Sequence, residues 1–269
     1  MNAPAIEIKN ATVKLDGYEA LTDFSCTIGH RERWFVLGPN GAGKTTFVKL
    51  LLGLAWPLWG ASVSVLGQKY GECNIMELRK KVAWVSPFLN TWAADSTYSK
   101  RWTAREIVLG GLDSTIGFFR TPTKEDLAQA DQAMEMIHAT KFADRWFDRL
   151  SSGEQVRILI ARALISHPEL VILDEACIFL DLTSREILLN AVDDLAARPD
   201  SPTMVFVTQR IEEITASFDK GMIIKDGKIM ASGDRKDVLT EKNLSEAFEL
   251  NVMLDCTADG RLWPIVKRS

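Results

Sequence analysis

A glycine-rich segment between an apolar run and a helical pattern limits the folds open to this chain more than any other feature. The segment Gly38 to Thr45 has the pattern Gly-x4-Gly-Lys-Thr, follows the apolar run Trp34 to Leu37, and leads into helical character from Thr45 to Leu52. A loop in this position turns successive backbone N–H groups inward around phosphates, and the helix after it presents a positive N-terminus. The alternative, a plain turn whose lysine faces solvent, does not account for the flanking strand and helix. The sequence therefore predicts a phosphate-binding loop.

The last residues of this loop have side chains that suit a magnesium nucleotide. Lys44 would reach the β- and γ-phosphates, and the Thr45 hydroxyl would be a ligand of Mg²⁺. The residues expected to bind the nucleotide are Gly38, Pro39, Asn40, Gly41, Ala42, Gly43, Lys44, Thr45 and Thr46.

Net charge and cysteine content indicate which kinds of partner and which cellular compartment to expect. The 32 Lys and Arg residues against 36 Asp and Glu residues give a net charge of −4, so we expect no direct binding to nucleic acid. The cysteines are scattered without metal-ligand spacing, which is typical of reduced thiols in a cytosolic protein. The N-terminus has no signal-peptide pattern. Glycine and proline interrupt the uncharged stretch from Leu50 to Gln68, so we expect a helix end, a turn and a strand there and not a membrane span.

Apolar segments outline an α/β fold. Ile6 to Val13 and Ala20 to Ile28 read as two short strands joined by a turn at Asp16-Gly17. Buried strands separated by helices indicate a parallel sheet, and the absence of a linker favours one unit over two independent domains. The fully apolar strands are Trp34 to Leu37, Val82 to Val85, Leu170 to Leu173 and Met204 to Val207.

The region from about Thr103 to His167 has a helical pattern, and Thr123 with Asp126 resembles a capping box. The tail from Met222 to Lys267 predicts a strand, a turn at Asp226-Gly227, a strand, two short helices and a hairpin. One apolar helix face is expected to contain Leu127, Ala130, Met134, Ile137 and His138.

An acidic pair, Asp174-Glu175, follows the apolar strand that ends at Leu173. The carboxyl ends of parallel strands meet at the ligand edge of a sheet, so these carboxylates are expected beside the phosphate loop. Asp174 can hold Mg²⁺ through water, and Glu175 can polarise a water in line with the γ-phosphate. Two merely solvated carboxylates are the alternative, and the phosphate loop makes that reading much less attractive.

A third motif carries a family resemblance. Leu150-Ser151-Ser152-Gly153-Glu154-Gln155 precedes an apolar helical run and resembles the Leu-Ser-Gly-Gly-Gln signature of ATP-binding cassette (ABC) ATPases. Ser152 replaces the first glycine and Glu154 replaces the glutamine. The family's order of phosphate loop, helical subdomain, signature and acidic pair is present, and Leu180-Asp181 is similar to its D-loop. The resemblance spans roughly Ile6 to Ala247.

The resemblance implies a fold, a ligand and an assembly. The fold is a P-loop NTPase (RecA-like) core with a mainly parallel sheet, an N-terminal antiparallel β subdomain and an inserted α-helical subdomain. Residues 1–269 would form one nucleotide-binding domain, with its core at about 1–86 and 165–269 and the helical subdomain at about 87–164. The ligands are ATP and Mg²⁺. Ser151 and Gly153 would contact the γ-phosphate held by a second copy, in an ATP-dependent head-to-tail homodimer; the serine is also expected to cap its helix.

Several stretches also resemble the ModF-type cassettes, a group related to molybdate-transport ATPases that often lacks an obvious membrane partner. These stretches are Trp34 to Lys44, Val65 to Gly67, Leu78 to Lys80, Ala83 to Ser86, Leu159 to Leu164 and Ile211 to Ile214.

The chain departs from the family pattern at positions that matter for hydrolysis. Pro87 occupies the place of the Q-loop glutamine, with Asn90 as the nearest amide, and Gln209 stands where the switch histidine should be. A glutamine can donate a hydrogen bond to a phosphate but lacks the charge and proton chemistry of imidazole. We therefore expect secure ATP binding and slow hydrolysis, with Glu175 and Gln209 as the catalytic residues. There are two further departures from the family pattern. Ala176 replaces the proline that usually follows the acidic pair, and the aromatic residue that usually stacks on adenine falls near Leu15, although Tyr18 could serve if the loop bends.

Two functions fit these features. The first is the ATPase subunit of a transporter, working beside membrane permease subunits at the inner face of the membrane. The second is an ATP-dependent switch or scaffold that hydrolyses little. The retained Glu175 favours the first, whereas Gln209 and Pro87 favour the second. DNA-repair or translation ATPases built on the same cassette carry coiled coils or two cassettes, for which 269 residues leave no room.

Overall fold

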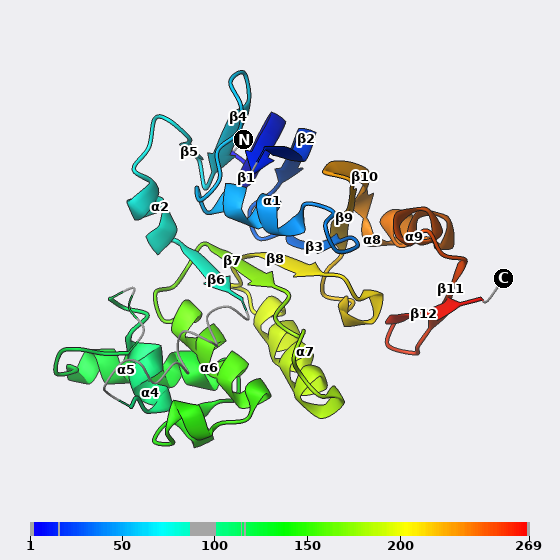
Figure 1. Cartoon of the computed structure of the whole chain (residues 1–269). Coiled ribbons are helices and arrows are strands. Elements are labelled where there is room, and N and C mark those ends of the chain that lie inside the picture. Colours follow the sequence, from blue (N-terminus) through cyan, green and yellow to red (C-terminus); the bar gives the residue numbers. More distant parts are fainter. Residues whose placement is uncertain (1–2, 16, 87–100, 114, 116, 268–269) are drawn as a thin grey trace. The chain divides into compact units, whose positions relative to one another are not determined.

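Strands and helices alternate along the chain in the computed structural model, which describes residues 3–15, 17–86, 101–113, 115 and 117–267. The described residues fall into two compact units (Figure 1). The first unit combines Met1–Arg79 with Pro202–Ser269, and the second consists of Lys80–Ser201.

An antiparallel sheet begins the first unit. Strands β1 (Ile6–Leu15) and β2 (Tyr18–Ile28) form a hairpin, and β4 (Ser62–Val65) and β5 (Gln68–Lys69) extend it in the order β2-β1-β4-β5. Alternate residues of β1 are buried, because successive side chains of a strand point to opposite faces. Gly17, at the hairpin turn, has a φ of +87°, a conformation that suits glycine.

A second set of strands in this unit is mainly parallel. Strand β3 (Arg33–Leu37) lies between β8 (Thr203–Thr208) and β9 (Lys220–Lys225) and is parallel to both. Strand β10 (Lys228–Asp234) pairs antiparallel with β9. Every residue of β8 is buried, as expected for a strand within a parallel sheet. Helix α1 (Lys44–Leu51) follows β3, and α2 (Ile75–Lys80) follows β5.

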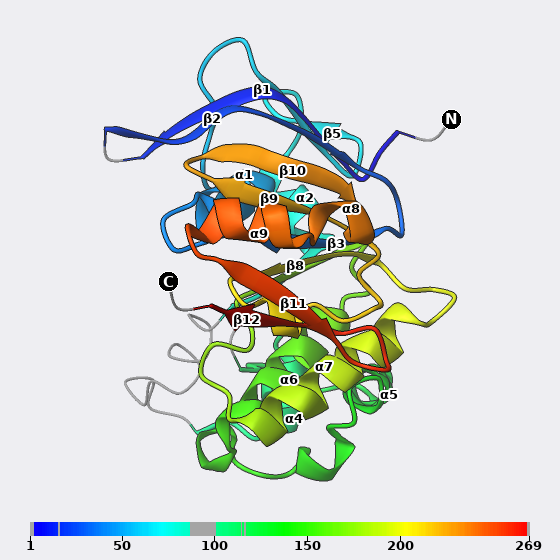
Figure 2. The same cartoon turned by 90° about the vertical axis from the view of Figure 1, so that its right-hand side faces the viewer.

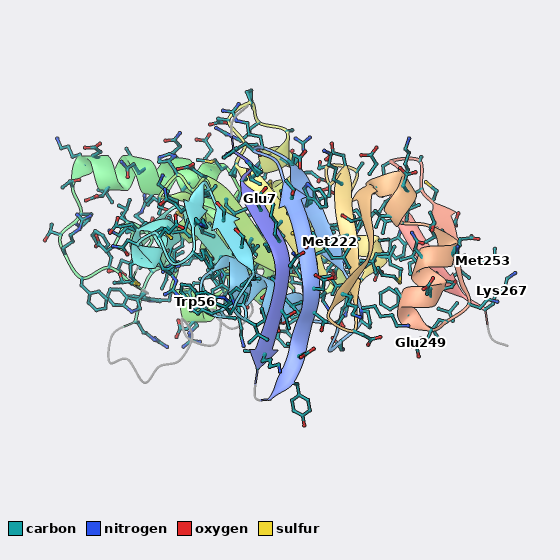
Figure 3. All side chains as sticks on the ribbon, turned by 90° about the horizontal axis from the view of Figure 1, so that it is seen from above. Glu7, Trp56, Met222, Glu249, Met253 and Lys267 are labelled. Carbon is teal, nitrogen blue, oxygen red and sulfur yellow. The ribbon has the colours of Figure 1, made fainter. Side chains whose placement is uncertain are left out.

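The C-terminal part of the first unit contains η3 (Ile211–Glu213), α8 (Arg235–Val238), α9 (Glu241–Phe248) and a hairpin of β11 (Val252–Cys256) and β12 (Leu262–Val266). Helix α9 packs against β9, β10 and β11, as Figure 2 shows. Lys225 on β9 donates a hydrogen bond of 2.8 Å to Glu249 at the end of α9. Figure 3 labels this glutamate, Met253 of the hairpin and the buried Met222 on β9.

Helices dominate the second unit. Strands β6 (Val82–Val85) and β7 (Leu170–Asp174) are parallel neighbours. Among the described residues between them, the α-helices are α4 (Ala104–Leu109), α5 (Lys124–Glu135) and α6 (Ser152–Leu164). The short turns η1 (Thr140–Phe142) and η2 (Phe147–Arg149) lead into α6, and α7 (Leu182–Ala196) follows β7. Helix α6 packs against α4, α5, α7 and β6, and is therefore the centre of this unit.

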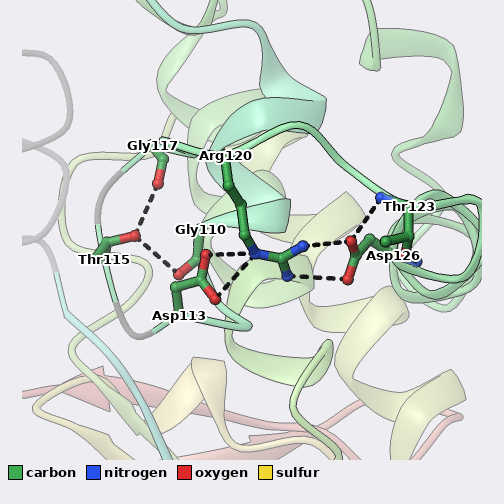
Figure 4. Close-up of polar contacts among 7 residues, drawn as sticks. All are labelled: Gly110, Asp113, Thr115, Gly117, Arg120, Thr123 and Asp126. Carbon is green, nitrogen blue, oxygen red and sulfur yellow. Dashed lines mark hydrogen bonds and ion pairs between the residues drawn. The ribbon is translucent and has the colours of Figure 1, made fainter.

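An arginine in the α4–α5 connection forms hydrogen bonds with the start of α5 (Figure 4). The Arg120 guanidinium donates two hydrogen bonds to the Asp126 carboxylate, at 2.6 and 3.0 Å, and approaches Asp113 at 3.2 Å. These bonds hold the pKa of Asp126 below its ordinary value. Asp126 also completes a capping box with Thr123, so one carboxylate both starts the helix and fixes the loop before it.

The structure confirms the α/β fold, with mainly parallel strands, an N-terminal antiparallel sheet and a helical segment between β6 and β7. The predicted order of elements in the tail and the capping box at Thr123 are also confirmed. The stretch from Leu50 to Gln68 contains the end of α1, a turn and β4. In the described part of the chain, no helix has the length and hydropathy to cross a membrane.

One predicted helix face is wrong at its end. Helix α5 stops at Glu135, and His138 adopts a φ of +53°, which breaks the helical repeat. Ala130, Met134 and Ile137 are buried as predicted, but the His138 side chain is exposed, and its Nε2 donates a hydrogen bond to the Asp194 carboxylate (2.9 Å).

Candidate nucleotide-binding site

Backbone packing fixes the loop between β3 and α1 in the first unit. Strand β3 ends at Leu37, and Gly43, with a φ of +106°, is the N-cap residue of α1. A Cβ atom on Gly38 would lie 2.2 Å from the backbone oxygen of Ile224, and one on Gly43 would lie 2.6 Å from that of Ala20. Neither position can hold a side chain without moving backbone, so the path of this loop requires glycine at both positions.

The lysine of the loop folds back along it. The Lys44 ammonium donates hydrogen bonds to the carbonyl oxygens of Gly38 (2.8 Å) and Pro39 (3.0 Å), and the residue is 5% exposed. These bonds place a buried positive charge at the entrance of the loop. A phosphate at this point would accept a charge-assisted hydrogen bond from the same ammonium.

The start of α1 has no side-chain cap, whereas α5, α6 and α7 each begin with one. Helices α5 and α6 each begin with a capping box and an acidic residue in the first turn, whereas α1 has neither a side-chain cap nor an acid there. The N–H groups at its start and the Lys44 ammonium therefore make one positively polarised end, which fits an anionic group. Thr45 is exposed at this end and Thr46 is buried, so Thr45 is the more accessible of the two threonines.

Gln209 lies at the same edge of the first unit as the loop. Strands β3 and β8 are parallel, and Leu37, the residue before Gly38, is paired with Thr208, the residue before Gln209. The two strands thus bring the phosphate loop and Gln209 to one edge of this unit. Gln209 is half-buried.

The acidic pair ends strand β7 in the second unit. Every residue of this strand is buried, and Asp174, its last residue, is 6% exposed. Glu175 follows with a φ of +51°, a left-handed conformation that is uncommon for residues with a side chain. Such conformations cluster at functional sites because the surrounding structure must hold them. The motif predicts the position of Glu175 but carries no signal for its backbone conformation.

The signature segment forms the start of α6. The Ser151 hydroxyl accepts a hydrogen bond from the Glu154 amide (3.4 Å), and the Glu154 carboxylate accepts one from the Ser151 amide (2.8 Å). Burial alone would raise the pKa of Glu154, but the bonds from Ser151 and the neighbouring Arg145 outweigh it and lower that pKa. Ser151 is the helix cap, as predicted, and Glu154 is a partner that its serine-x-x-glutamate spacing could have revealed.

Gly153 has a packing role inside the second unit. A Cβ atom there would lie 2.5 Å from the Cβ of Ser184, so only glycine lets α6 approach the first turn of α7 this closely. Asp181, the residue of the predicted D-loop, caps α7 by accepting a hydrogen bond of 2.8 Å from the Ser184 amide. The signature and the D-loop are therefore neighbours through Ser184.

Some predicted positions remain predictions. Pro87 and Asn90, at the expected Q-loop, lie outside the described residues. Tyr18, one of the two candidates for adenine stacking, is 78% exposed at the start of β2, and Leu15 ends β1. The role of each site residue likewise stays a prediction.

A glycine loop between a parallel strand and a helix, with its lysine folded onto the loop, defines a P-loop nucleotide-binding protein. The family model described as "ABC transporter" matches residues 21–178, more than half of the chain. The ABC transporter ATP-binding protein YlmA of Bacillus subtilis (strain 168), which is uncharacterized, is 37% identical over 247 residues, covering 91% of this chain and 90% of YlmA.

Two further comparisons bear on the subgroup and the fold. The ABC transporter ATP-binding protein ModF of Escherichia coli (strain K12) is 30% identical over 217 residues, covering 80% of this chain but 43% of ModF. Among solved structures, an ABC transporter in an inward-facing conformation matches with a TM-score of 0.78 and 26% identity, covering 99% of this chain and 98% of that one.

The chain therefore belongs to the ABC transporter family. It is an ABC-type ATP-binding protein and ATPase, of the kind that serves as the ATP-binding subunit of a transporter. The comparisons give no support to the alternative of a switch or scaffold.

Proposed function

We propose that this chain binds Mg-ATP and hydrolyses it slowly, as the ATPase subunit of a transporter. The observation that carries the proposal is the Lys44 ammonium, held at the carbonyls of Gly38 and Pro39 beside the uncapped start of α1. Membrane permease subunits are the expected partners, so the chain would act at the cytoplasmic face of a membrane. Those subunits would recognise the transported substrate.

The site residues divide the chemistry among them. Lys44 and the N–H groups of the loop from Gly38 to Thr46 bind the phosphates. The Thr45 hydroxyl and Asp174 would hold Mg²⁺, which would supply positive charge beside the phosphates. Glu175 orients a water for in-line attack and accepts its proton, and Gln209 donates an amide hydrogen bond to the γ-phosphate.

Slow turnover follows from the amide at position 209. An imidazole can carry a positive charge and exchange a proton near neutral pH, whereas a primary amide does neither. The amide keeps a hydrogen bond but loses that charge and proton exchange, and by analogy with losing one transition-state donor we expect a cost of roughly 10²–10³ in rate. Pro87 at the Q-loop position supports the same expectation. ATP binding depends on other groups, the loop backbone and Lys44, and should be retained.

A second copy of the chain would complete the site. Ser151 and Gly153, at the start of α6, would contact the γ-phosphate bound to the other copy, in a head-to-tail dimer that forms with ATP. Exposed apolar side chains support a contact in this region: Phe179 and Leu182, on either side of the D-loop, are 73% and 64% exposed.

The chain would work as one nucleotide-binding domain, with its core at about 1–86 and 165–269 and a helical subdomain at about 87–164. Within the family, the resemblance of several stretches to ModF supports a ModF-type subgroup. ModF itself is matched over 43% of its length, so this chain would correspond to one part of a ModF-like protein.

Phosphate release by three proteins tests the proposal. We expect slow release by the wild type, a rate at least 100-fold lower for Glu175→Gln, and a faster rate for Gln209→His. Light scattering should find a dimer of Glu175→Gln in ATP, with Lys44→Ala as the control that cannot bind the nucleotide. Equal rates for the wild type and Glu175→Gln would remove Glu175 from catalysis, and equal rates for the wild type and Gln209→His would contradict the role of position 209.

A further inference from the structure

A buried threonine closes the turn that carries Gln209. The Thr208 side chain, 1% exposed at the end of β8, accepts a hydrogen bond from the Arg210 amide (3.0 Å). Its hydroxyl proton is donated to the Glu213 carboxylate (2.5 Å). One hydroxyl therefore binds the chain on the far side of Gln209 at two points, once directly after it and once at the end of η3.

The acceptor of that bond is an acid where apolar residues would be expected. Glu213 is 2% exposed, and the Arg210 guanidinium approaches its carboxylate at 3.8 Å. A buried carboxylate lowers stability unless hydrogen bonds and charges compensate it, so hydrophobic packing does not explain an acid here. The hydrogen bond from Thr208 gives the acid a role at this position, because it connects the first and last residues of the turn.

This closed turn stands at the nucleotide edge of the first unit. Thr208 is the β8 partner of Leu37, and the phosphate loop begins at the next residue, Gly38. A displacement of the Gln209 backbone by about 1 Å is enough to lower the rate of a positioned reaction roughly 100-fold. A turn held at both ends limits such displacement.

We infer that Thr208 and Glu213 are positioning residues, which hold the amide of Gln209 in place for its contact with the γ-phosphate. The inference rests on the proposed role of Gln209. The two residues would act through Gln209 and not on the nucleotide directly. Removing either side chain should therefore lower turnover without weakening ATP binding.

Strand β8 offers a matched control at its other end. Thr203 is also 1% exposed, and its hydroxyl accepts a hydrogen bond from the Arg31 amide (2.9 Å). Thr208→Val and Thr203→Val each remove one buried hydroxyl from the same strand and keep its shape. We expect Thr208→Val to lower kcat about tenfold or more with the Kd for ATP unchanged. Thr203→Val should keep the wild-type kcat, and Thr208→Ser, which keeps the hydroxyl, should restore it.

Amide hydrogen exchange can test, without nucleotide, whether Thr208 holds the turn. In Thr208→Val the Arg210 amide loses its acceptor, and loss of one hydrogen bond should speed its exchange about tenfold. The same amide should exchange at the wild-type rate in Thr203→Val. Equal exchange in both variants would mean that Thr208 does not hold the turn.

Combining Thr208→Val with Gln209→Ala tests whether Thr208 changes kcat through Gln209. If Thr208 acts through Gln209, Thr208→Val lowers kcat in the wild type but not in Gln209→Ala. An equal loss in both backgrounds, or no loss in either, overturns the inference alone. A wild-type kcat for Gln209→Ala would instead remove the proposed role of Gln209, and this inference with it. Should Thr208→Val fail to fold, Glu213→Gln, which keeps the shape but weakens the charge-assisted bond, enters the same cycle.

Discussion

Gly38 shows how a single residue connects the fold to the site. A methyl group at this position would overlap the backbone oxygen of Ile224, which cannot move without disturbing β9. We expect Gly38→Ala to lower the free energy of unfolding by about 2–3 kcal/mol and to abolish ATP binding, because the Gly38 carbonyl also holds Lys44.

Gly67 is the control for this substitution. It has a φ of +72° with no neighbour near its missing side chain, so Gly67→Ala should cost only about 1 kcal/mol from backbone strain. ATP binding should be unchanged in Gly67→Ala. Urea unfolding and nucleotide titration of both variants make the comparison, and retention of wild-type ATP affinity by Gly38→Ala would contradict the packing argument.

Single residues also mark where prediction from sequence ends. The glycine-lysine motif locates the phosphate loop because a local pattern of residue types specifies it. The left-handed conformation of Glu175 and the bond between Thr208 and Glu213 depend on what surrounds them in the folded chain. No spacing in the sequence separates Glu213, which is buried, from its neighbour Glu212.

At the scale of elements, the capping box of α6 makes stability depend on pH. The pKa of Glu154 is lower in the folded protein than its ordinary value of 4.5, so folding favours the ionised form. Its contribution is complete above pH about 4.5 and is lost as the pH falls through the lowered pKa. Glu154→Gln should therefore be less stable than the wild type near neutral pH, with the difference shrinking in acid.

Urea unfolding at several pH values measures this difference. Glu125→Gln is the control. Glu125 also lies in the first turn of a helix, α5, but is not part of its capping box, so this variant removes only the charge at the helix start. A stability difference for Glu154→Gln that stays constant down to pH 3 would mean that the carboxylate charge does not hold the box.

Elements were predictable where burial repeats along the chain. Strands β3, β7 and β8 are fully apolar or nearly so, and the structure buries them along their length, apart from the half-buried first residue of β3. The end of α5 was not predictable, because Ile137 continues the apolar repeat after the helix has stopped. A left-handed residue, His138, ends that region, and the sequence there contains no glycine or proline to signal it.

At the scale of the whole molecule, the proposed site needs residues from two copies of the chain. Asp is as good a helix cap as Ser, so Ser151→Asp keeps the start of α6 while its charge repels a phosphate. Lys44→Ala instead disables the phosphate loop and leaves the signature intact. Each variant alone should be inactive, but a mixed dimer joins the loop of the first to the signature of the second.

Mixing the two inactive proteins in equal amounts should therefore restore phosphate release to about a quarter of the wild-type rate, since half of the dimers are mixed and each has one working site. Mixing Lys44→Ala with Glu175→Gln should restore nothing, because Glu175 would serve the loop of its own chain and both sites of that mixed dimer are defective. Restoration with Ser151→Asp alone establishes that the signature acts across copies. If neither mixture recovers activity while mixed dimers form, Ser151 does not act on the partner's nucleotide, and its role is confined to capping α6.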